Sequence, residues 1–412
     1  MLDQKKYLRE LARETYNYAT SDIMDSRRAA WTKHNDLNWS GKPLLYIRSI
    51  PFHEILLAKD LKCDTPVLRR LEREFLLNRY RMSLPDDYII EPYININAAV
   101  ARSKDSLWGI PCSLSGHHVG PAGAKSFNPS ILELEDVKKM YVTDYTVDEL
   151  ETQKKFDTMY DLLGDSIPIA VNRATPFAGP WEADICTMLT QMRGLEQLMI
   201  DFYDDPEWLH DLLAFMRDSI LRQLDLTEQA GGFSSINTIN QAMPYSTGLA
   251  NRSKIEPVNS TKDLWIFTAA QEYTGVGPAM FKEFLFDYQK PITEKFGLAS
   301  YGCCEDMTQK IDIIKTLKNL RRIAVTPFSN TQKCAEQIGS DYVVSWRPHP
   351  ADAVTYGFDE TRTRNTMREN FKIFRDNHCT FDITLKDAHT IGKDPAAIDK
   401  WTKVVREEIE NF

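Results

Sequence analysis

The stretch LASYGCCED, residues 298–306, joins a short apolar segment to a polar end that carries two adjacent thiols. A helical pattern precedes it and ends at Gly297, and another runs from 308 to 318. A short buried strand that ends in polar residues and leads into a helix is typical of the βα unit of parallel α/β proteins. In such units ligands and catalytic groups gather at the carboxyl ends of the strands. The stretch therefore predicts both a fold class and a place for a site.

Similar units recur along most of the chain. We expect eight strands alternating with helices, at 87–97, 167–173, 233–240, 264–272, 298–306, 321–329, 341–350 and 380–390. This alternation predicts a (β/α)8 TIM barrel of the α/β class. A doubly wound open sheet is the alternative, but no GxGxxG follows any of these strands.

The domain organisation follows from the same pattern. No linker rich in Pro, Gly or Ser divides the chain, so we expect a single domain over 1–412. Its first part, 1–86, is predicted as an N-terminal helical extension, and 87–412 as the barrel. Within the extension, helices are expected at 3–34 and 64–82, with a strand-like segment at 43–50.

Composition narrows the class of protein. The content of 42% hydrophobic and 26% charged residues is ordinary for a soluble globular protein. A net charge of −9 without a run of Lys and Arg argues against nucleic acid as a partner. No signal peptide or run of eighteen apolar residues is present, which argues against a membrane. Seven cysteines without a framework spacing indicate reduced thiols and a cytoplasmic protein.

Polar residues close the predicted strands, as expected if that end of the barrel carries the site. Exposed loops in general would show the same bias. These residues are Asn95, Asn97, Asn172, Arg173, Asn237, Asn240, Gln271, Glu272, Cys303–Asp306, Ser329, Arg347, His349, Lys386, Asp387 and His389. Aromatic residues lie in the same loops, among them Phe177 and Trp346, and would suit a flat apolar ligand.

His389 is the sharpest candidate for acid–base chemistry, because it closes the last strand in LKDAHTIG. In an extended strand His389 and Asp387 share one face while Lys386 takes the other. A carboxylate partner would raise the affinity of the histidine for its proton. The alternative is a surface or helix-capping histidine. Cys303 and Cys304 have a similar alternative, as small buried residues beside a helix cap.

Three segments resemble a known family. GPWEADICTMLTQMRGLEQLMIDFYDDPEWLHDLL, 179–213, looks like a characteristic segment of the uroporphyrinogen decarboxylase superfamily. YGCCEDMTQKIDIIKTLKNLRRIAVTPF, 301–328, and TFDITLKDAHTIGKDPAAIDKWTKVVREEIE, 380–410, resemble a subgroup found beside corrinoid proteins. Together the three segments cover about a quarter of the chain.

The resemblance implies either a decarboxylase or a corrinoid-dependent methyltransferase. Decarboxylases of this superfamily carry an Arg-rich motif of the type FMRQAGRY, of which LLYIRSIPFHEIL, 44–56, keeps one arginine. Methyltransferases that act on thiols bind zinc through His-x-Cys and a later Cys. Here Tyr301-Gly302-Cys303 stands at the first position and His389 at the second. Because both the decarboxylase motif and the zinc-binding motif of the thiol methyltransferases are incomplete, the chain resembles instead the methyltransferase component of anaerobic aryl-ether O-demethylases.

That component moves a methyl group from a phenyl methyl ether to the cobalamin of a separate corrinoid protein, and a homodimer is compatible with it. Phenolate leaves poorly, so the ether oxygen needs a proton donor or a Lewis acid. Candidate catalytic residues are His389, Asp387, Glu272 and Tyr301; candidate substrate-binding residues are Asn172, Phe177, Trp346, Arg347 and His349. A zinc ion would be held by Cys303 or Cys304 with His389 and a carboxylate, Glu305 or Glu272.

Other activities stay open at this stage. A decarboxylase acting on a tetrapyrrole would need several cations in the pocket, for which Arg173 and Arg347 are available. A methyltransferase could use another small methyl donor. A barrel that only binds a corrinoid protein or a small aromatic compound is the non-catalytic alternative.

Overall fold

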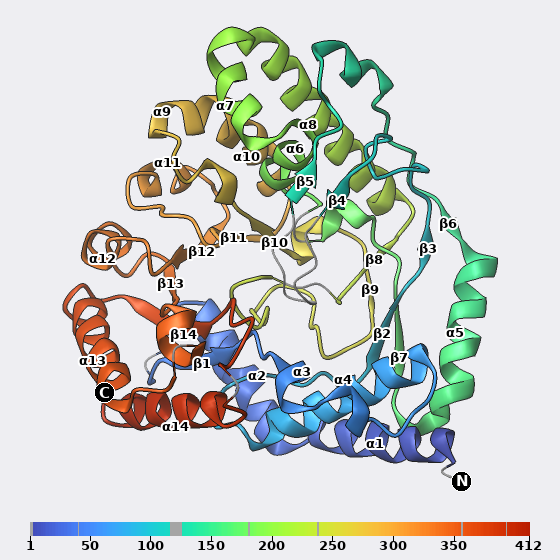
Figure 1. Cartoon of the computed structure of the whole chain (residues 1–412), viewed down its shortest axis with the longest axis vertical. Coiled ribbons are helices and arrows are strands. Elements are labelled where there is room, and N and C mark those ends of the chain that lie inside the picture. Colours follow the sequence, from blue (N-terminus) through green and yellow to red (C-terminus); the bar gives the residue numbers. More distant parts are fainter. Residues whose placement is uncertain are drawn as a thin grey trace.

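A parallel sheet of six strands forms the centre of the computed structural model, with helices on its outer side (Figure 1). The structure describes residues 3–39, 41–115, 126–179, 182–236, 239–355, 357–392 and 394–412. Along the sheet the strands are β1 (Leu44–Ile47), β14 (Thr380–Leu385), β13 (Val343–Trp346), β12 (Leu320–Val325), β11 (Leu298–Tyr301) and β10 (Trp265–Thr268). Every neighbouring pair is parallel. The expected α/β class is therefore confirmed.

The composition of these strands explains their burial. LLYI in β1, WIFT in β10 and VVSW in β13 are buried at every position. Continuous β-branched and aromatic runs of this kind fit strands that are covered on both faces.

The remaining strands form small sheets of their own. β2 (Ile94–Asn97) pairs in parallel with β7 (Ile169–Asn172), and β8 (Phe233–Ser234) pairs antiparallel with β9 (Pro257–Val258). Two further antiparallel pairs join β3 (Ala99–Val100) to β6 (Val147–Asp148) and β4 (Ser113–Ser115) to β5 (Ser126–Asn128). The structure thus has a mixed α/β architecture, with strands nearer the centre of Figure 1 than most helices.

The helices surround the strands in chain order. They are α1 (Gln4–Ala19), α2 (Asp22–Asn35), α3 (Phe52–Ile55), α4 (Pro66–Ser83), α5 (Glu149–Leu163), α6 (Ile185–Arg193), α7 (Leu195–Asp204), α8 (Pro206–Gln229), α9 (Pro278–Phe281), α10 (Asp287–Thr293), α11 (Ile311–Ile314), α12 (Thr331–Ile338), α13 (Glu360–Asp376) and α14 (Ala397–Glu410). α14 shows why such segments dock: it buries Trp401, Val405 and Ile409, which recur every four residues on one face.

Three expectations about the strands need correction. The segment at 43–50 was assigned to the N-terminal extension, but β1 lies in the main sheet beside β14. The first core strand was expected at 87–97, whereas only Ile94–Asn97 is a strand and it lies in a separate pair. Among the described residues, the strand expected at 233–240 is limited to β8. Asn237, which was also predicted at this strand end, lies outside the described residues.

The segment that follows β8 places a polar side chain at the end of the main sheet. After β8 the chain crosses the end of the main sheet, where Gln241 Nε2 donates hydrogen bonds to the carbonyl oxygens of Tyr301 (2.7 Å) and Gly302 (2.9 Å). This segment therefore supplies side chains to the sheet end instead of continuing as a strand.

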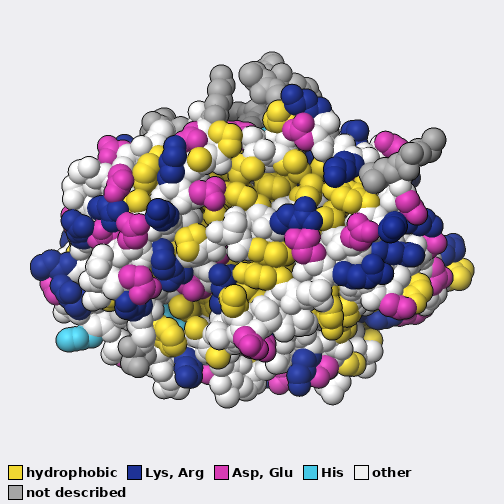
Figure 2. All heavy atoms as spheres, turned by 90° about the horizontal axis from the view of Figure 1, so that it is seen from below, with side chains coloured by type: hydrophobic (Ala, Val, Ile, Leu, Met, Phe, Trp, Pro, Cys, Tyr) yellow, Lys and Arg dark blue, Asp and Glu magenta, His cyan; other side chains and the backbone are white. Residues whose placement is uncertain are grey.

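One face of the molecule, at the bottom of Figure 1, is seen directly in Figure 2. On that face Lys and Arg side chains are interspersed with Asp and Glu, between patches of hydrophobic side chains. It therefore lacks the continuous basic surface that a nucleic acid requires. None of the helices in the described part of the chain is long and apolar enough to cross a membrane.

Candidate active site

A cavity of about 590 Å³ lies at the carboxyl ends of the main-sheet strands. Segments that follow all six strands contribute to its wall, so its position agrees with the general rule for parallel sheets. The lining residues are Arg48, Ser49, Asn240, Gln271, Cys303, Cys304, Thr326, Pro327, Phe328, Arg347, Pro348, His349, Pro350, Lys386, Asp387 and His389.

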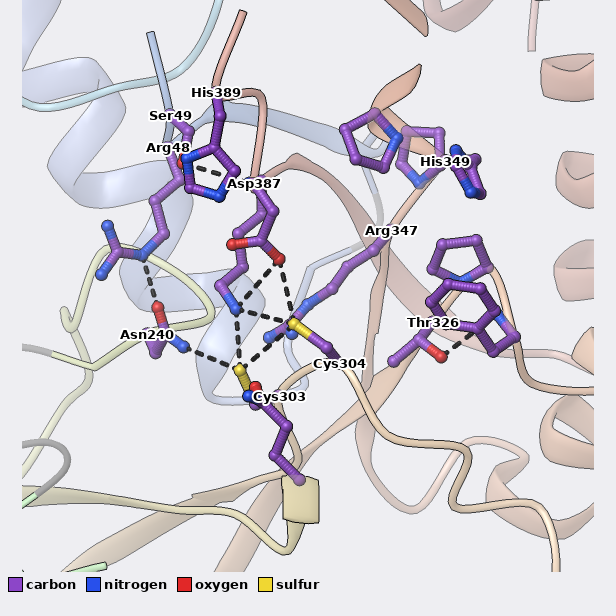
Figure 3. A pocket seen from close by; sticks show the side chains of 16 residues that line it. Arg48, Ser49, Asn240, Cys303, Cys304, Thr326, Arg347, His349, Asp387 and His389 are labelled. Atoms are coloured by element: carbon purple, nitrogen blue, oxygen red, sulfur yellow. Dashed lines mark hydrogen bonds and ion pairs between the residues drawn. The ribbon is translucent and has the colours of Figure 1, made fainter. Parts of the chain in front are cut away.

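Two thiols and an ion pair form one cluster in the cavity (Figure 3). The sulfur atoms of Cys303 and Cys304 are 3.4 Å apart. Lys386 Nζ donates to Cys303 Sγ at 2.8 Å and to Cys304 Sγ at 3.3 Å. Asp387 Oδ2 accepts a hydrogen bond from Cys304 Sγ at 3.0 Å and lies 3.3 Å from Lys386 Nζ. The ammonium group of Lys386 therefore contacts both thiols and a carboxylate.

This arrangement gives the two thiols different pKa values. The hydrogen bond with Cys304 lowers the pKa of Cys303 to about 7, aided by the charges of Arg347 and Lys386 and opposed by burial. The same hydrogen bond, together with burial, raises the pKa of Cys304. Above about pH 7 the pair thus holds one thiolate and one thiol, with Lys386 as the counter-ion.

Asp387 stays ionised in the same cluster. Burial acts to raise its pKa, but Lys386 and the hydrogen bond from Cys304 outweigh burial, so that the pKa lies below its ordinary value. Its backbone has a φ of 59°, a left-handed conformation that is uncommon for residues other than glycine. Such conformations tend to occur at functional sites.

The backbone around the thiols is held from several sides. Glu305 accepts hydrogen bonds from the amides of Cys303 (2.7 Å) and Ala270 (2.8 Å). Gly302 has a φ of 99°, and a Cβ atom there would lie 3.0 Å from the Ala324 Cβ atom. The position of the two sulfurs therefore depends on a glycine at 302.

Gly302→Ala is expected to lower the free energy of unfolding by about 1–3 kcal/mol, because it adds both backbone strain and a close contact. Gly339→Ala is the matched control, since Gly339 also has a positive φ (53°) but nothing within 4 Å of an added Cβ. Urea denaturation of both variants measures the difference. Equal losses would mean that the contact with Ala324 contributes nothing.

Two arginines add positive charge to the cavity. Arg347 is only 3% exposed, and its Nη2 lies 3.4 Å from the Gly302 carbonyl oxygen. Its Nε and Nη1 atoms have no hydrogen-bond partner among the described residues. Arg48 Nε donates to Asn240 Oδ1 at 2.6 Å. With Lys386, three cationic side chains face one cavity, which favours an electron-rich or anionic ligand atom.

The opposite wall is apolar. Phe328 and His349 meet edge to face with 5.8 Å between ring centroids, and Pro327, Pro348 and Pro350 lie beside them. Phe328 is 66% exposed, so its ring is available for contact with a ligand. An apolar wall facing a few convergent polar groups suits a small aromatic molecule.

Six of the residues predicted for the site line this cavity: Cys303, Cys304, Arg347, His349, Asp387 and His389. His389 is exposed and makes no hydrogen bond or ion pair with the described residues. It therefore lies at the rim, while the thiol cluster lies deeper.

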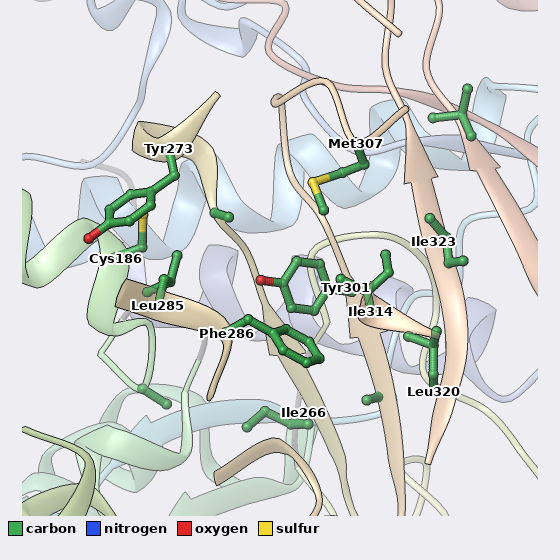
Figure 4. Close-up of a cluster of buried hydrophobic side chains, with 14 of the residues drawn as sticks. Cys186, Ile266, Tyr273, Leu285, Phe286, Tyr301, Met307, Ile314, Leu320 and Ile323 are labelled. Carbon is green, nitrogen blue, oxygen red and sulfur yellow. The ribbon is translucent and has the colours of Figure 1, made fainter. Parts of the chain in front are cut away.

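Two predicted catalytic residues lie elsewhere. Tyr301 is fully buried in the core beside Phe286 (Figure 4), and its hydroxyl donates to Gln289 Oε1 at 2.6 Å. Burial holds its pKa well above the ordinary value. The Glu272 carboxylate accepts hydrogen bonds from Thr187 (3.0 Å) and Cys186 (3.1 Å), and its neighbour Gln271 faces the cavity instead.

Three predicted substrate-binding residues also lie outside the cavity. Trp346 is buried against Phe374, with 6.0 Å between ring centroids. Phe177 packs on Trp108 at 5.1 Å. Asn172, at the end of β7, accepts a hydrogen bond from the Ala174 amide at 3.1 Å. The sequence pattern placed these side chains at strand ends but did not indicate which way each side chain points.

The donor set does not fit a zinc ion. Of the five candidate ligands, Glu305 accepts hydrogen bonds from two backbone amides, Glu272 accepts them from Thr187 and Cys186, and His389 lies at the rim. Lys386 already places a positive charge against both sulfurs. Among the described residues no three His, Cys, Asp or Glu side chains are arranged to hold a metal.

Sequence reasoning named Lys386 and Asn240 only as polar residues at strand ends, and it gave Arg48 no place in the site. Lys386 was assigned to the face opposite Asp387, but β14 ends at Leu385. The alternation of an extended strand does not continue beyond that residue, and Lys386 and Asp387 both reach Cys304. The signal that could have found Arg48 is its place near the end of the strand-like segment at 43–50.

Comparison with known proteins adds little to this picture. A solved structure of a methyltransferase from Methanosarcina mazei is similar to this chain, with a TM-score of 0.46 and 8% sequence identity. The similarity covers 94% of this chain and 98% of that chain. No protein-family profile and no curated protein matches the chain. A similarity of this degree does not decide the fold or the activity.

Proposed function

We propose that the protein is a corrinoid-dependent methyltransferase that takes the methyl group of a small aromatic methyl ether. The acceptor is the cob(I)alamin of a separate corrinoid protein. The observation that carries the proposal is the cavity, in which an apolar wall around Phe328 faces the proton donors Lys386 and Cys304. Together with the resemblance of 301–328 and 380–410 to the methyltransferase subgroup, this arrangement supports an acid-assisted methyl transfer. We also propose that the strands close into a (β/α)8 barrel.

Different residues of the cavity have different roles in the proposed reaction. The aromatic ring of the ether would lie against Phe328 and His349, since flat apolar surfaces bind aromatic rings. The reduced corrinoid supplies the nucleophile that accepts the methyl group. As the methyl–oxygen bond breaks, the ether oxygen gains negative charge and needs a proton or a cation. Lys386 supplies both, with Arg347 as a second positive charge nearby.

A methyl-transfer assay tests this proposal. Purified protein is mixed with a methoxylated aromatic compound and a reduced corrinoid protein, and formation of the phenol is measured. Phenol that appears only when all three components are present supports the proposal. No phenol with any methoxylated compound would contradict it.

His389→Ala is expected to lower the rate of methyl transfer by less than Lys386→Met does. His389 is exposed at the rim, where water competes for its hydrogen bonds, whereas Lys386 is only 6% exposed. Steady-state rates of the two variants in the same assay give the comparison. An equal or larger loss in His389→Ala would assign the proton donor to His389.

A decarboxylase acting on a tetrapyrrole is the second candidate, favoured by the three cations Arg48, Arg347 and Lys386 in one cavity. Arg173 does not add to them, because it pairs with Glu149 at 2.9 Å away from this cavity. Release of carbon dioxide from a tetrapyrrole, without any corrinoid, would favour this candidate.

A further inference from the structure

Cys303 and Cys304 differ from the other cysteines of the chain by their contact with one another. All seven cysteines are free, and this is the one cysteine pair that hydrogen-bonds among the described residues, with 3.4 Å between the sulfurs. A disulfide bond is about 2.05 Å long, so the sulfurs need to approach by little more than an ångström. Both side chains line the cavity, and Cys304 is partly exposed to it.

The surroundings of the pair favour reaction at sulfur. Lys386 stabilises a thiolate at Cys303, and the Asp387 carboxylate is placed to take the proton of Cys304. The thiolate is the reactive form of cysteine, and nearby cations promote it. Burial instead raises the pKa of the other five cysteines, which are Cys63, Cys112, Cys186, Cys334 and Cys379. An oxidant would therefore select this pair.

We propose that Cys303 and Cys304 are a redox modification site, at which a hydroperoxide forms a reversible disulfide between the two neighbouring residues. The Cys303 thiolate attacks one peroxide oxygen, the O–O bond breaks, and the hydroxide that leaves takes up the proton that Cys303 had given up, which forms water. The Cys304 sulfur then attacks the Cys303 sulfur, the S–S bond forms, and the S–O bond breaks. The departing hydroxide takes up the thiol proton of Cys304. Two thiols and one hydrogen peroxide thus yield one disulfide and two waters.

The disulfide would be easy to reduce. Consecutive Cα atoms are about 3.8 Å apart across a trans peptide. Most disulfides join Cα atoms about 4.4–6.8 Å apart, so a disulfide between neighbours is strained. Strained disulfides have more oxidising potentials and are the labile, regulatory ones. A dithiol reductant should therefore restore the thiols.

The modification would also change the cavity. Lys386 would lose its thiolate partner, and Asp387 would lose the hydrogen bond from Cys304. The ammonium and the carboxylate, 3.3 Å apart, would keep their ion pair. If the proposed methyl transfer uses Lys386 as donor, this pairing makes the oxidised protein inactive. Loss of activity thus rests on the proposed function, whereas formation of the disulfide does not.

Intact-mass analysis after treatment with hydrogen peroxide tests the modification. The whole chain should lose the mass of two hydrogens, and peptide mapping should place the loss on the segment that holds Cys303 and Cys304. Dithiothreitol should reverse it. Phenylarsine oxide, which bridges paired thiols, should bind the reduced protein in the absence of denaturant and not the oxidised protein.

Two variants sharpen the test. Cys304→Ser should not form the disulfide, whereas Cys379→Ser should form it like the wild type; circular dichroism checks that both are folded. Peroxide-treated wild type that keeps both thiols, or gains oxygen at Cys303 without the bridge, would overturn the proposal. A disulfide in a protein that transfers no methyl group when reduced would support the redox site and count against the proposed function.

Discussion

Lys386→Met lowers the rate of methyl transfer by about 10²- to 10⁴-fold, the loss typical for removal of a proton donor. Among the residues that the structure describes, Lys386 is the one cation in direct contact with both thiols and Asp387. Methionine has a similar length and no charge, so the cavity keeps its shape while the ether oxygen loses its donor. The rate of phenol formation with a reduced corrinoid protein measures the effect.

The same variant should change the chemistry of Cys303. Lys386 helps to lower the pKa of this thiol to about 7, so its removal should shift that pKa upward. The pH dependence of alkylation by iodoacetamide, followed by mass spectrometry, reports the shift. Lys386→Arg is the control: it keeps the charge, and with it the low pKa, but is a poor proton donor. Full activity in Lys386→Arg would show that charge, and not proton transfer, is what the reaction needs.

Local sequence patterns were sufficient for most strands of the main sheet. β11, β12, β13 and β14 each combine β-branched or aromatic residues with a following helix, and all four lie within or close to the expected segments. β1 was assigned elsewhere because its partner is remote: Leu44 pairs with Asp382, at the other end of the chain. No local pattern contains that pairing.

The site was predictable to the level of segments but not of side chains. The strand ends pointed to Cys303, Arg347 and Asp387, and these three residues line the cavity. The sequence pattern did not show in which direction the side chain at each strand end points. Tyr301, for example, points into the core (Figure 4). The left-handed backbone of Asp387 likewise ends the regular alternation on which the placement of Lys386 was based.

A buried ionic cluster inside the sheet was also invisible in the sequence, and it leads to the largest expected change in stability. Arg322 of β12 contacts Asp382 of β14 at 2.5 Å, and His34 of α2 contacts the same carboxylate at 2.9 Å. All three side chains have no exposed surface. Arg322 also donates to Asn35 Oδ1 at 2.7 Å. These contacts tie an N-terminal helix to two strands of the sheet.

Arg322→Met should lower the free energy of unfolding by about 3–5 kcal/mol, because it leaves the Asp382 carboxylate buried without its main counter-charge. Urea denaturation measures the loss. The double variant Arg322→Met with Asp382→Leu should recover a large part of it, since an apolar pair of similar volume needs no counter-charge. A double variant as unstable as the single one would mean that packing, and not charge, is responsible.

Acid should weaken the same cluster in two steps. Burial lowers the pKa of His34 below its ordinary 6.5, so the unfolded chain binds a proton there that the folded chain does not. Stability is therefore lost as the pH falls below 6.5. Burial acts to raise the pKa of Asp382, but Arg322 and His34 outweigh it and hold the pKa below 3.8, so a second loss follows in stronger acid. Free energies of unfolding measured across this range should fall in wild type, and His34→Gln should remove the first step while keeping the second.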